Sequence, residues 1–404
     1  MLPVTICTGI VRRGVPDAGT ERQEKMTVVR VLADDLTGAL DTICEFATTR
    51  EPIPVFWQSD ALSTKSGSYA IDTETRDSSA RDAVENIASL TPVLLEADIA
   101  VKKLDSLLRG HTAAEIAACL DTSAFASAVV APAFPSQGRI TRNGRQFVLQ
   151  DAGREPQELA CNLIAELGGL GHVSRLAKQS DDVAGSGIFV CDAETDDDLS
   201  NVVVAGRGLM TPILWCGCAG LTRALSERKL IESHQLPSSP VLIIIGSDHL
   251  SSAAQTERLA KIHPELITIV DSSSLDDIWV SIKFLAHRID QGLPSALAFR
   301  FAADTSHTLA SRIVSETLAV AVEQLPCPGS VLVAGGDTLF RFVSAAGAVS
   351  LAVSGELVPG IPISKLKGGK WDALTVVSKS GAFGKADILC ALLDQFQENS
   401  NDIT

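Results

Sequence analysis

Short runs rich in β-branched residues alternate with amphipathic segments along almost the whole chain. This alternation is typical of βαβ units built around a mainly parallel sheet. It predicts strands at 27–32, 54–57, 69–72, 99–103, 127–131, 187–191, 212–215, 241–245, 266–270, 296–301, 331–334 and 374–378. Between them, spacings of three and four residues between apolar positions predict helices that include 78–90, 112–120 and 157–167.

A polar segment rich in Pro and Ser separates the chain into two halves. It covers residues 232–240, and a new apolar strand begins directly after it at 241. Such a composition is typical of a linker between domains. We therefore predict an N-terminal domain at 26–235 and a C-terminal domain at 236–404. Residues 1–25 lack the apolar stretch of a signal peptide, and we expect them to be a disordered extension or a misassigned start.

Composition narrows the class of protein. The chain has 404 residues, of which 46% are apolar, and carries a net charge of −15. An acidic chain is a poor partner for nucleic acid, and no apolar run reaches the 18 to 20 residues of a membrane span. The nine cysteines are scattered, which favours reduced thiols in the cytoplasm. Cys216 and Cys218 form a C-x-C pair without further ligands nearby, so we predict no metal site there.

Polar residues follow several predicted strands of the first half. In parallel sheets these strand ends share one edge, so the residues should converge there. Carboxylates with Arg and Lys suit a small polyhydroxylated acid, because the cations bind its carboxylate and the carboxylates bind its hydroxyls. The alternative is a helix cap at Asp34 beside a structural ion-pair network. The residues concerned are Asp34, Asp35, Asp72, Glu74, Arg76, Lys103, Asp105 and Arg109.

The second half has glycine turns where the first has carboxylates. Gly335 and Gly336 follow a strand and open a helix, an arrangement in which free backbone amides bind phosphate. Similar turns occur at 246–247 and around Gly381. Together they favour a nucleotide, although each alone also has a steric explanation. Neither a P-loop sequence nor G-x-G-x-x-G is present, which argues against P-loop enzymes and dinucleotide folds.

Another shaped loop follows the strand at 127–131. It contains two prolines and two glycines, with Arg139 and Arg142 as candidate anion contacts. The alternative is a surface turn with solvated arginines.

Several of these segments occur together in one known family. In order along the chain, residues 27–395 resemble the four-carbon acid sugar kinases. The motifs that carry the resemblance are ADDLTGA at 33–39, DTETR at 72–76, KLDSLLRG at 103–110, APAFPSQGRIT at 131–141, GGDT at 335–338 and KSGAFG at 379–384. At Leu107 the family usually has threonine. This difference lies in the half of the chain that the resemblance assigns to the acid, so it bears on which acid is phosphorylated rather than on phosphoryl transfer.

The resemblance implies ATP-dependent phosphorylation of a threonate, erythronate or oxo-tetronate type acid, with Mg²⁺. It implies an α/β fold of two domains, each a mainly parallel sheet flanked by helices, with the active site in the interdomain cleft. It places Asp34, Asp35, Arg76, Lys103, Asp105, Arg109 and Arg139 at the acid. It places Ser247, Gly335, Gly336, Asp337, Thr338 and Gly381 at the nucleotide.

The chemistry leaves some alternatives open. Asp35 is our first candidate for the carboxylate that orients or deprotonates the acceptor hydroxyl, with Asp105 and Asp337 as rivals. A NAD-dependent hydroxy-acid dehydrogenase would share the architecture and the anionic substrate. A two-lobed acid-binding sensor would need the anion site but not the glycine turns. The sequence also leaves open whether the chain forms a homo-oligomer.

Overall fold

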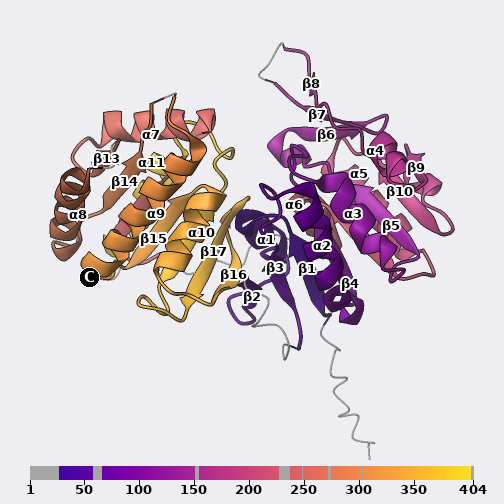
Figure 1. The fold of residues 1–404 in the computed structure, drawn as a ribbon, viewed down its shortest axis with the longest axis horizontal. Coiled ribbons are helices and arrows are strands. Elements are labelled where there is room, and N and C mark those ends of the chain that lie inside the picture. The colour runs from indigo at the N-terminus through magenta and orange to yellow at the C-terminus, as the bar shows by residue number, and fades with distance from the viewer. Residues whose placement is uncertain are drawn as a thin grey trace, which may run out of the picture.

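The computed structural model describes residues 27–57, 66–150, 154–226, 237–247, 249–271, 274–302 and 304–401. The predicted extension at 1–25 and the predicted domain boundary at 235–236 lie outside these ranges. The described residues form two α/β lobes, coloured indigo to magenta and salmon to yellow in Figure 1. No helix among them combines the length and the apolar character that crossing a membrane requires.

The N-terminal lobe has parallel strands in the order β2-β3-β1-β4-β11-β5-β10-β9. Its strands are β1 (Val29–Ala33), β2 (Ile53–Phe56), β3 (Tyr69–Asp72), β4 (Ile99–Lys103), β5 (Ser127–Ala131), β9 (Ser174–Ala177), β10 (Gly187–Cys191) and β11 (Ile213–Gly217). Its helices are α1 (Leu36–Ile43), α2 (Ala80–Leu90), α3 (Thr112–Asp121), α4 (Leu163–Gly169), α5 (Asp196–Arg207) and α6 (Ala219–Ser226).

The C-terminal lobe has parallel strands in the order β13-β14-β12-β15-β18, followed by the antiparallel pair β17-β16. Its strands are β12 (Val241–Ile245), β13 (Ile267–Val270), β14 (Ser295–Phe299), β15 (Ser330–Ala334), β16 (Ser350–Val358), β17 (Ile361–Lys367) and β18 (Thr375–Lys379). Its helices are α7 (Leu250–Ile262), α8 (Leu275–Asp290), α9 (His307–Gln324), α10 (Gly336–Ala345) and α11 (Ile388–Asn401).

Both lobes bury the central strands of their sheets on both faces. Every residue of β1, β5, β12 and β15 is buried. Helices cover both faces of the sheet. The sequences of these strands are therefore nearly continuous apolar runs and do not alternate between apolar and polar residues. This is why the sequence pattern located them to within one or two residues.

The two lobes share one continuous sheet, which the sequence did not predict. Strand β16 pairs antiparallel with β2, with Leu351 opposite Val55, and the two strands lie side by side in the middle of Figure 1. The α/β class and the mostly parallel strands are as predicted, but the two parallel regions are joined through β17 and β16. The turn at Pro359 and Gly360 between apolar runs is the signal that could have revealed this hairpin.

Two local predictions near the edge of the N-terminal lobe were wrong. The helix expected at 157–167 begins only at Leu163, because Asn162 caps α4 by accepting the N–H of Ala165. The residues before it include the short strand β8 (Gln157–Glu158). The expected loop after β5 contains the hairpin strand β6 (Arg139–Arg142), which pairs with β7 (Arg145–Val148). Arg142, a candidate anion contact, forms a salt bridge with Glu194.

Candidate functional site

The first turns of α1 and α10 face each other where the lobes meet. Asp35 is the N-cap of α1, and its Oδ1 accepts the Gly38 N–H at 2.8 Å. Gly335 is the N-cap of α10. Its φ of +112° is a backbone conformation that favours glycine, and it offers no side-chain cap. A Cβ on Gly336 would lie 2.7 Å from Thr37 Oγ1 and 3.1 Å from Asp35 Oδ2. The amides that open α10 are therefore close to the carboxylate that opens α1.

Arg76 lies among three carboxylates at the edge of the N-terminal sheet. Its Nε and Nη2 donate to the two oxygens of Asp34 at 2.8 and 2.9 Å, and its Nη1 donates to Asp35. Its Nη2 is also 3.5 Å from Asp105 Oδ1. Burial raises the pKa of Asp34, but the nearby charges of Arg76 and then Lys103 outweigh this, so that the pKa is lower than usual. The predicted convergence of strand ends is therefore observed.

Asp105 is the most heavily paired carboxylate of this cluster. Arg109 binds both of its oxygens at 2.8 Å, and the backbone N–H groups of Leu107 and Arg109 donate to Oδ2. Burial raises the pKa of Asp105, but the Arg109 hydrogen bond and the Arg76 charge outweigh it and hold the pKa well below its usual range. Such a weakly basic carboxylate is a poor proton acceptor, which favours a positioning role for Asp105.

The three glycine turns of the C-terminal lobe pack against one another. A Cβ on Gly381 would overlap Ser247 Oγ, and one on Gly246 would overlap Thr338 Oγ1. Ser252 Oγ on α7 donates to the Gly381 carbonyl at 2.9 Å. Turns that are far apart in the chain therefore form one compact backbone surface, and glycine is required because side chains would collide.

A cleft of about 520 Å³ lies between these two groups of residues. This volume is in the usual range for a site that binds a small molecule. Of the predicted residues, its lining includes Asp34, Asp35, Arg76 and Arg109 from one lobe and Ser247, Gly335, Gly336, Asp337, Thr338 and Gly381 from the other. A smaller cavity of about 30 Å³ adjoins it and adds Lys103 and Asp105.

Arg139, which the family resemblance placed at the acid, lines neither cavity. Its guanidinium carbon lies 6.0 Å from the ring centre of Phe383, and Nη1 donates to the Gln137 carbonyl. Phe383 belongs to the loop after β18 and also packs edge-on against Phe134 of the N-terminal lobe. Arg139 therefore supports the contact between the lobes beside the site.

Some residues that line the small cavity were missed by the sequence analysis. They include Thr37 and Asp41 on α1, Cys218 before α6 and Phe383. The signal for Asp41 was available: a carboxylate follows Thr37 at a spacing of four in an otherwise apolar helix, which places both on one face. No local sequence pattern predicts Cys218 at this cavity, because only the tertiary fold brings it there.

Lys379 holds the loop at 380–384 from within the protein. It is 1% exposed, and its Nζ donates to the carbonyls of Ser380 and Phe383 at 2.7 and 3.0 Å. It makes no ion pair with any carboxylate of the described residues, and burial lowers its pKa to about 8. The Lys379 ammonium therefore holds this loop without a carboxylate partner from the described part of the chain.

We expect this lysine to make stability rise with pH in alkaline solution. Its pKa is about 8 in the folded protein against an ordinary value of 10.5, so between these values the unfolded chain binds more protons. The free energy of unfolding therefore increases with pH across this window, by at most about 3 kcal/mol. Urea unfolding of wild type and Lys379→Met from pH 7.5 to 10.5 tests this. Parallel pH profiles of the two proteins would contradict it.

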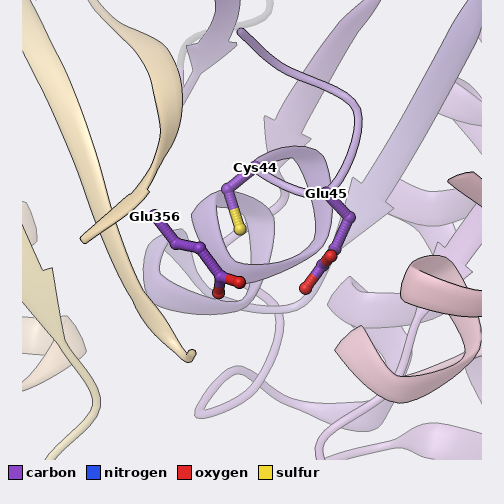
Figure 2. A group of neighbouring side chains, drawn as sticks. All are labelled: Cys44, Glu45 and Glu356. Carbon is purple, nitrogen blue, oxygen red and sulfur yellow. The ribbon is translucent and has the colours of Figure 1, made fainter. Parts of the chain in front are cut away.

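A second cluster of titratable groups lies outside the cleft, where β16 meets the N-terminal lobe. Figure 2 shows Cys44, Glu45 and Glu356, whose donor atoms all lie within 4.8 Å of one another. Arg223 Nη2 lies 2.8 Å from Glu45 Oε1 and 3.2 Å from Glu356 Oε1. Burial raises the pKa of the Cys44 thiol well above its usual range. Because a guanidinium already bridges the carboxylates, we interpret the cluster as an ion-pair link between the lobes rather than a metal site.

These observations define a two-lobed α/β protein with a cleft that has carboxylates and arginines on one side and helix-opening glycines on the other. Residues 29–160 match the model of a sugar-binding N-terminal domain, and residues 242–389 match that of a nucleotide-binding C-terminal domain. The chain belongs to the four-carbon acid sugar kinase family.

Individual relatives agree with this assignment over nearly the whole chain. A D-erythronate kinase of Heliobacterium modesticaldum is 26% identical, with 91% of this chain and 97% of the relative covered. A D-threonate kinase of Bordetella bronchiseptica is 27% identical, with coverage of 92% and 98%. A solved structure from Haemophilus influenzae has a TM-score of 0.63 at 20% identity, with coverage of 91% and 100%, and shows the same fold.

Proposed function

We propose that the protein transfers the γ-phosphoryl group of ATP to a hydroxyl of a four-carbon sugar acid of the threonate, erythronate or oxo-tetronate type. The observation that carries this proposal is the single cleft lined by both the Arg76 cluster and the glycine turns. Relatives named D-threonate kinase and D-erythronate kinase support the substrate class. We place the activity in the cytoplasm, because the cysteines within the described residues are all free thiols.

The nucleotide would bind on the C-terminal lobe with its phosphates at the start of α10. The amides after Gly335 point out of the helix at its positive dipole end, which stabilises phosphate. Ser247 and Gly381 complete the surface. The carboxylates of Asp35 and Asp337 line the same cleft and are oxygen donors of the kind that Mg²⁺ prefers. Magnesium bound with ATP would neutralise charge on the phosphates.

The acid would bind on the N-terminal lobe, beside Asp35 and Arg76. Arg109, whose side chain is half exposed, can turn toward the acid's carboxylate. Asp35 is our choice for the group that orients the acceptor hydroxyl, because its Oδ2 lies next to Gly336. Its rival Asp337 is 55% exposed and is bound at both oxygens by Arg341. Positioning of the hydroxyl near the phosphates is the main contribution expected of a carboxylate here.

A thermal-shift comparison tests the ligand classes. We expect ATP with magnesium, and separately a four-carbon acid, to raise the unfolding temperature, because a ligand at about 100 times its Kd stabilises by about 2.7 kcal/mol. NAD should have no effect. Stabilisation by NAD would favour a dehydrogenase, and stabilisation by the acid alone would favour a sensor.

A further inference from the structure

The small cavity beside the cleft contains polar groups without partners. Asp41 Oδ1 and Thr37 Oγ1 are buried and make no hydrogen bond within the described part of the chain. Lys103 is 6% exposed and lines the same cavity, and its ammonium forms no hydrogen bond or ion pair that the described residues provide. Leaving a buried carboxyl or ammonium unpaired is costly, so these groups point to a ligand that supplies the missing partners.

The other carboxylates of the site differ from Asp41 in this respect. Asp34 and Asp35 accept from Arg76, and Asp105 accepts from Arg109. Each of these three carboxylates therefore already accepts a hydrogen bond from an arginine of the protein itself. Asp41 alone among the carboxylates lining this cavity lacks a side-chain or backbone donor in the described structure.

The geometry of α1 explains how the cavity reaches Asp41. Asp41 follows Thr37 by four residues and Gly38 by three, spacings that make them neighbours on the helix surface, and all three line the small cavity. A Cβ on Gly38 would lie 2.6 Å from Asp35 Oδ1 and 2.8 Å from Lys103 Nζ. The glycine therefore leaves the space through which Lys103 approaches α1 at this point.

The size of the cavity limits what can occupy it. Its volume of about 30 Å³ holds a hydroxyl-bearing carbon or one or two waters, not a whole four-carbon acid. Asp35, Thr37 and Arg76 line both the cavity and the cleft, whereas Asp41 and Lys103 line the cavity alone. A molecule bound in the cleft can therefore place one of its groups into the cavity.

We propose that Asp41 and Lys103 bind one hydroxyl of the acid, one that is not phosphorylated, and that Asp41 thereby selects acids that carry this hydroxyl. The hydroxyl donates to the Asp41 carboxyl and accepts from the Lys103 ammonium, so that each of these buried groups gains a hydrogen-bond partner. This inference rests on the proposed function and names a specificity-determining residue for it. Sites built to hydrogen-bond a hydroxyl strongly reject analogues that lack it, because their buried polar groups then remain unpaired.

The charge state of Asp41 is compatible with this role. Burial raises the pKa of Asp41 well above its usual range, Lys103 opposes this, and Asp35, Glu356 and Glu45 add to it. Because its pKa is raised, the Asp41 carboxyl loses its proton less readily than an ordinary aspartate. It can therefore accept a hydrogen bond from a neutral hydroxyl, and no cation besides Lys103 is needed.

The test measures kcat/KM of wild type and Asp41→Ala with a four-carbon acid and with its deoxy analogues, each lacking one hydroxyl, because alanine removes the carboxyl oxygen that accepts from the hydroxyl. We expect the substitution to lower kcat/KM for the full acid about 10- to 100-fold, the usual effect of one hydrogen bond to a charged group, to leave the KM for ATP unchanged, and to have no effect with one particular deoxy acid. Thr42→Val is the matched control: Thr42 also has an unpartnered buried Oγ1 on α1 but lines neither cavity, so kcat/KM should not change.

Two results would overturn the inference. One is an equal loss with every acid, which indicates a structural role for Asp41. The other is an unchanged kcat/KM with the full acid. If the wild type phosphorylates none of the acids, the proposed function itself fails. The wild-type measurement alone reveals this outcome, so it is distinct from a failure of the inference about Asp41.

Discussion

Asp35→Asn should lower kcat by about 10² to 10⁴, the usual contribution of a positioned acid or base, with little change in the binding of ATP. Asp35 Oδ2 is close to Gly336, where we place the phosphates, so its charge acts on the acceptor hydroxyl in the transition state. Asparagine keeps the shape and is itself a good N-cap, so the hydrogen bond from the Gly38 amide should survive. The loss should therefore appear in turnover rather than in folding.

A matched substitution separates this effect from a general change in helix caps. Asp198 also accepts backbone hydrogen bonds at the start of a helix, α5, and it does not line either cavity. Asp198→Asn should leave kcat unchanged. Coupled measurement of ADP release gives kcat, and a thermal shift with ATP and magnesium gives nucleotide binding. Turnover of Asp35→Asn within a few-fold of wild type would exclude Asp35 from the chemistry.

Arg76→Gln should reduce the free energy of unfolding by about 3–5 kcal/mol, because it leaves buried carboxylates without their counterion. Asp34 and Asp105 are 4% and 6% exposed, and both lie beside the guanidinium. The pKa of Asp34 is lowered in the folded protein, so this stabilisation is complete above pH 3.8 and disappears as the pH falls through the folded pKa. The difference between the two proteins should therefore narrow in acid.

Urea unfolding at pH 7 and at pH 3 measures both effects. Arg109→Gln is the matched control, since it also removes an arginine from Asp105 but from a side chain that is half exposed. Its cost should be smaller than that of Arg76→Gln, because the Arg109 side chain is half exposed and Asp105 keeps the charge of Arg76 and two backbone N–H donors. An Arg76→Gln protein with the stability of wild type at pH 7 would show that Arg76 is not the charge that holds this cluster together.

The parts of the site that the sequence predicted lie at the ends of buried parallel strands. The strand before Asp34 and the strand before Gly335 are buried throughout, and the residues after the carboxyl ends of such strands lie at one edge of the sheet. This rule predicts that Arg76 lies near Asp105 and that the glycine turns lie near one another, and the structure shows both.

The rest depends on tertiary contacts that no local pattern encodes. Arg139 comes shortly after a strand end like the others, but it lies in the hairpin strand β6 with its guanidinium beside Phe383, and it is not among the residues that line the two cavities. The joining of the lobes depends on the pairing of β16 with β2, a strand from the other end of the chain. Asp41 could be placed on the face of Thr37 by helical spacing, yet only the packed structure shows that its carboxyl lacks a partner among the described residues.

Phosphoryl transfer between the two lobes is the central claim, and its most direct test is ADP release by the purified protein with ATP, magnesium and a panel of four-carbon sugar acids. We predict that at least one acid of the threonate, erythronate or oxo-tetronate type stimulates ADP release, with one phosphorylated acid formed for each ADP. ADP release that stays at the acid-free background with every member of the panel would contradict it.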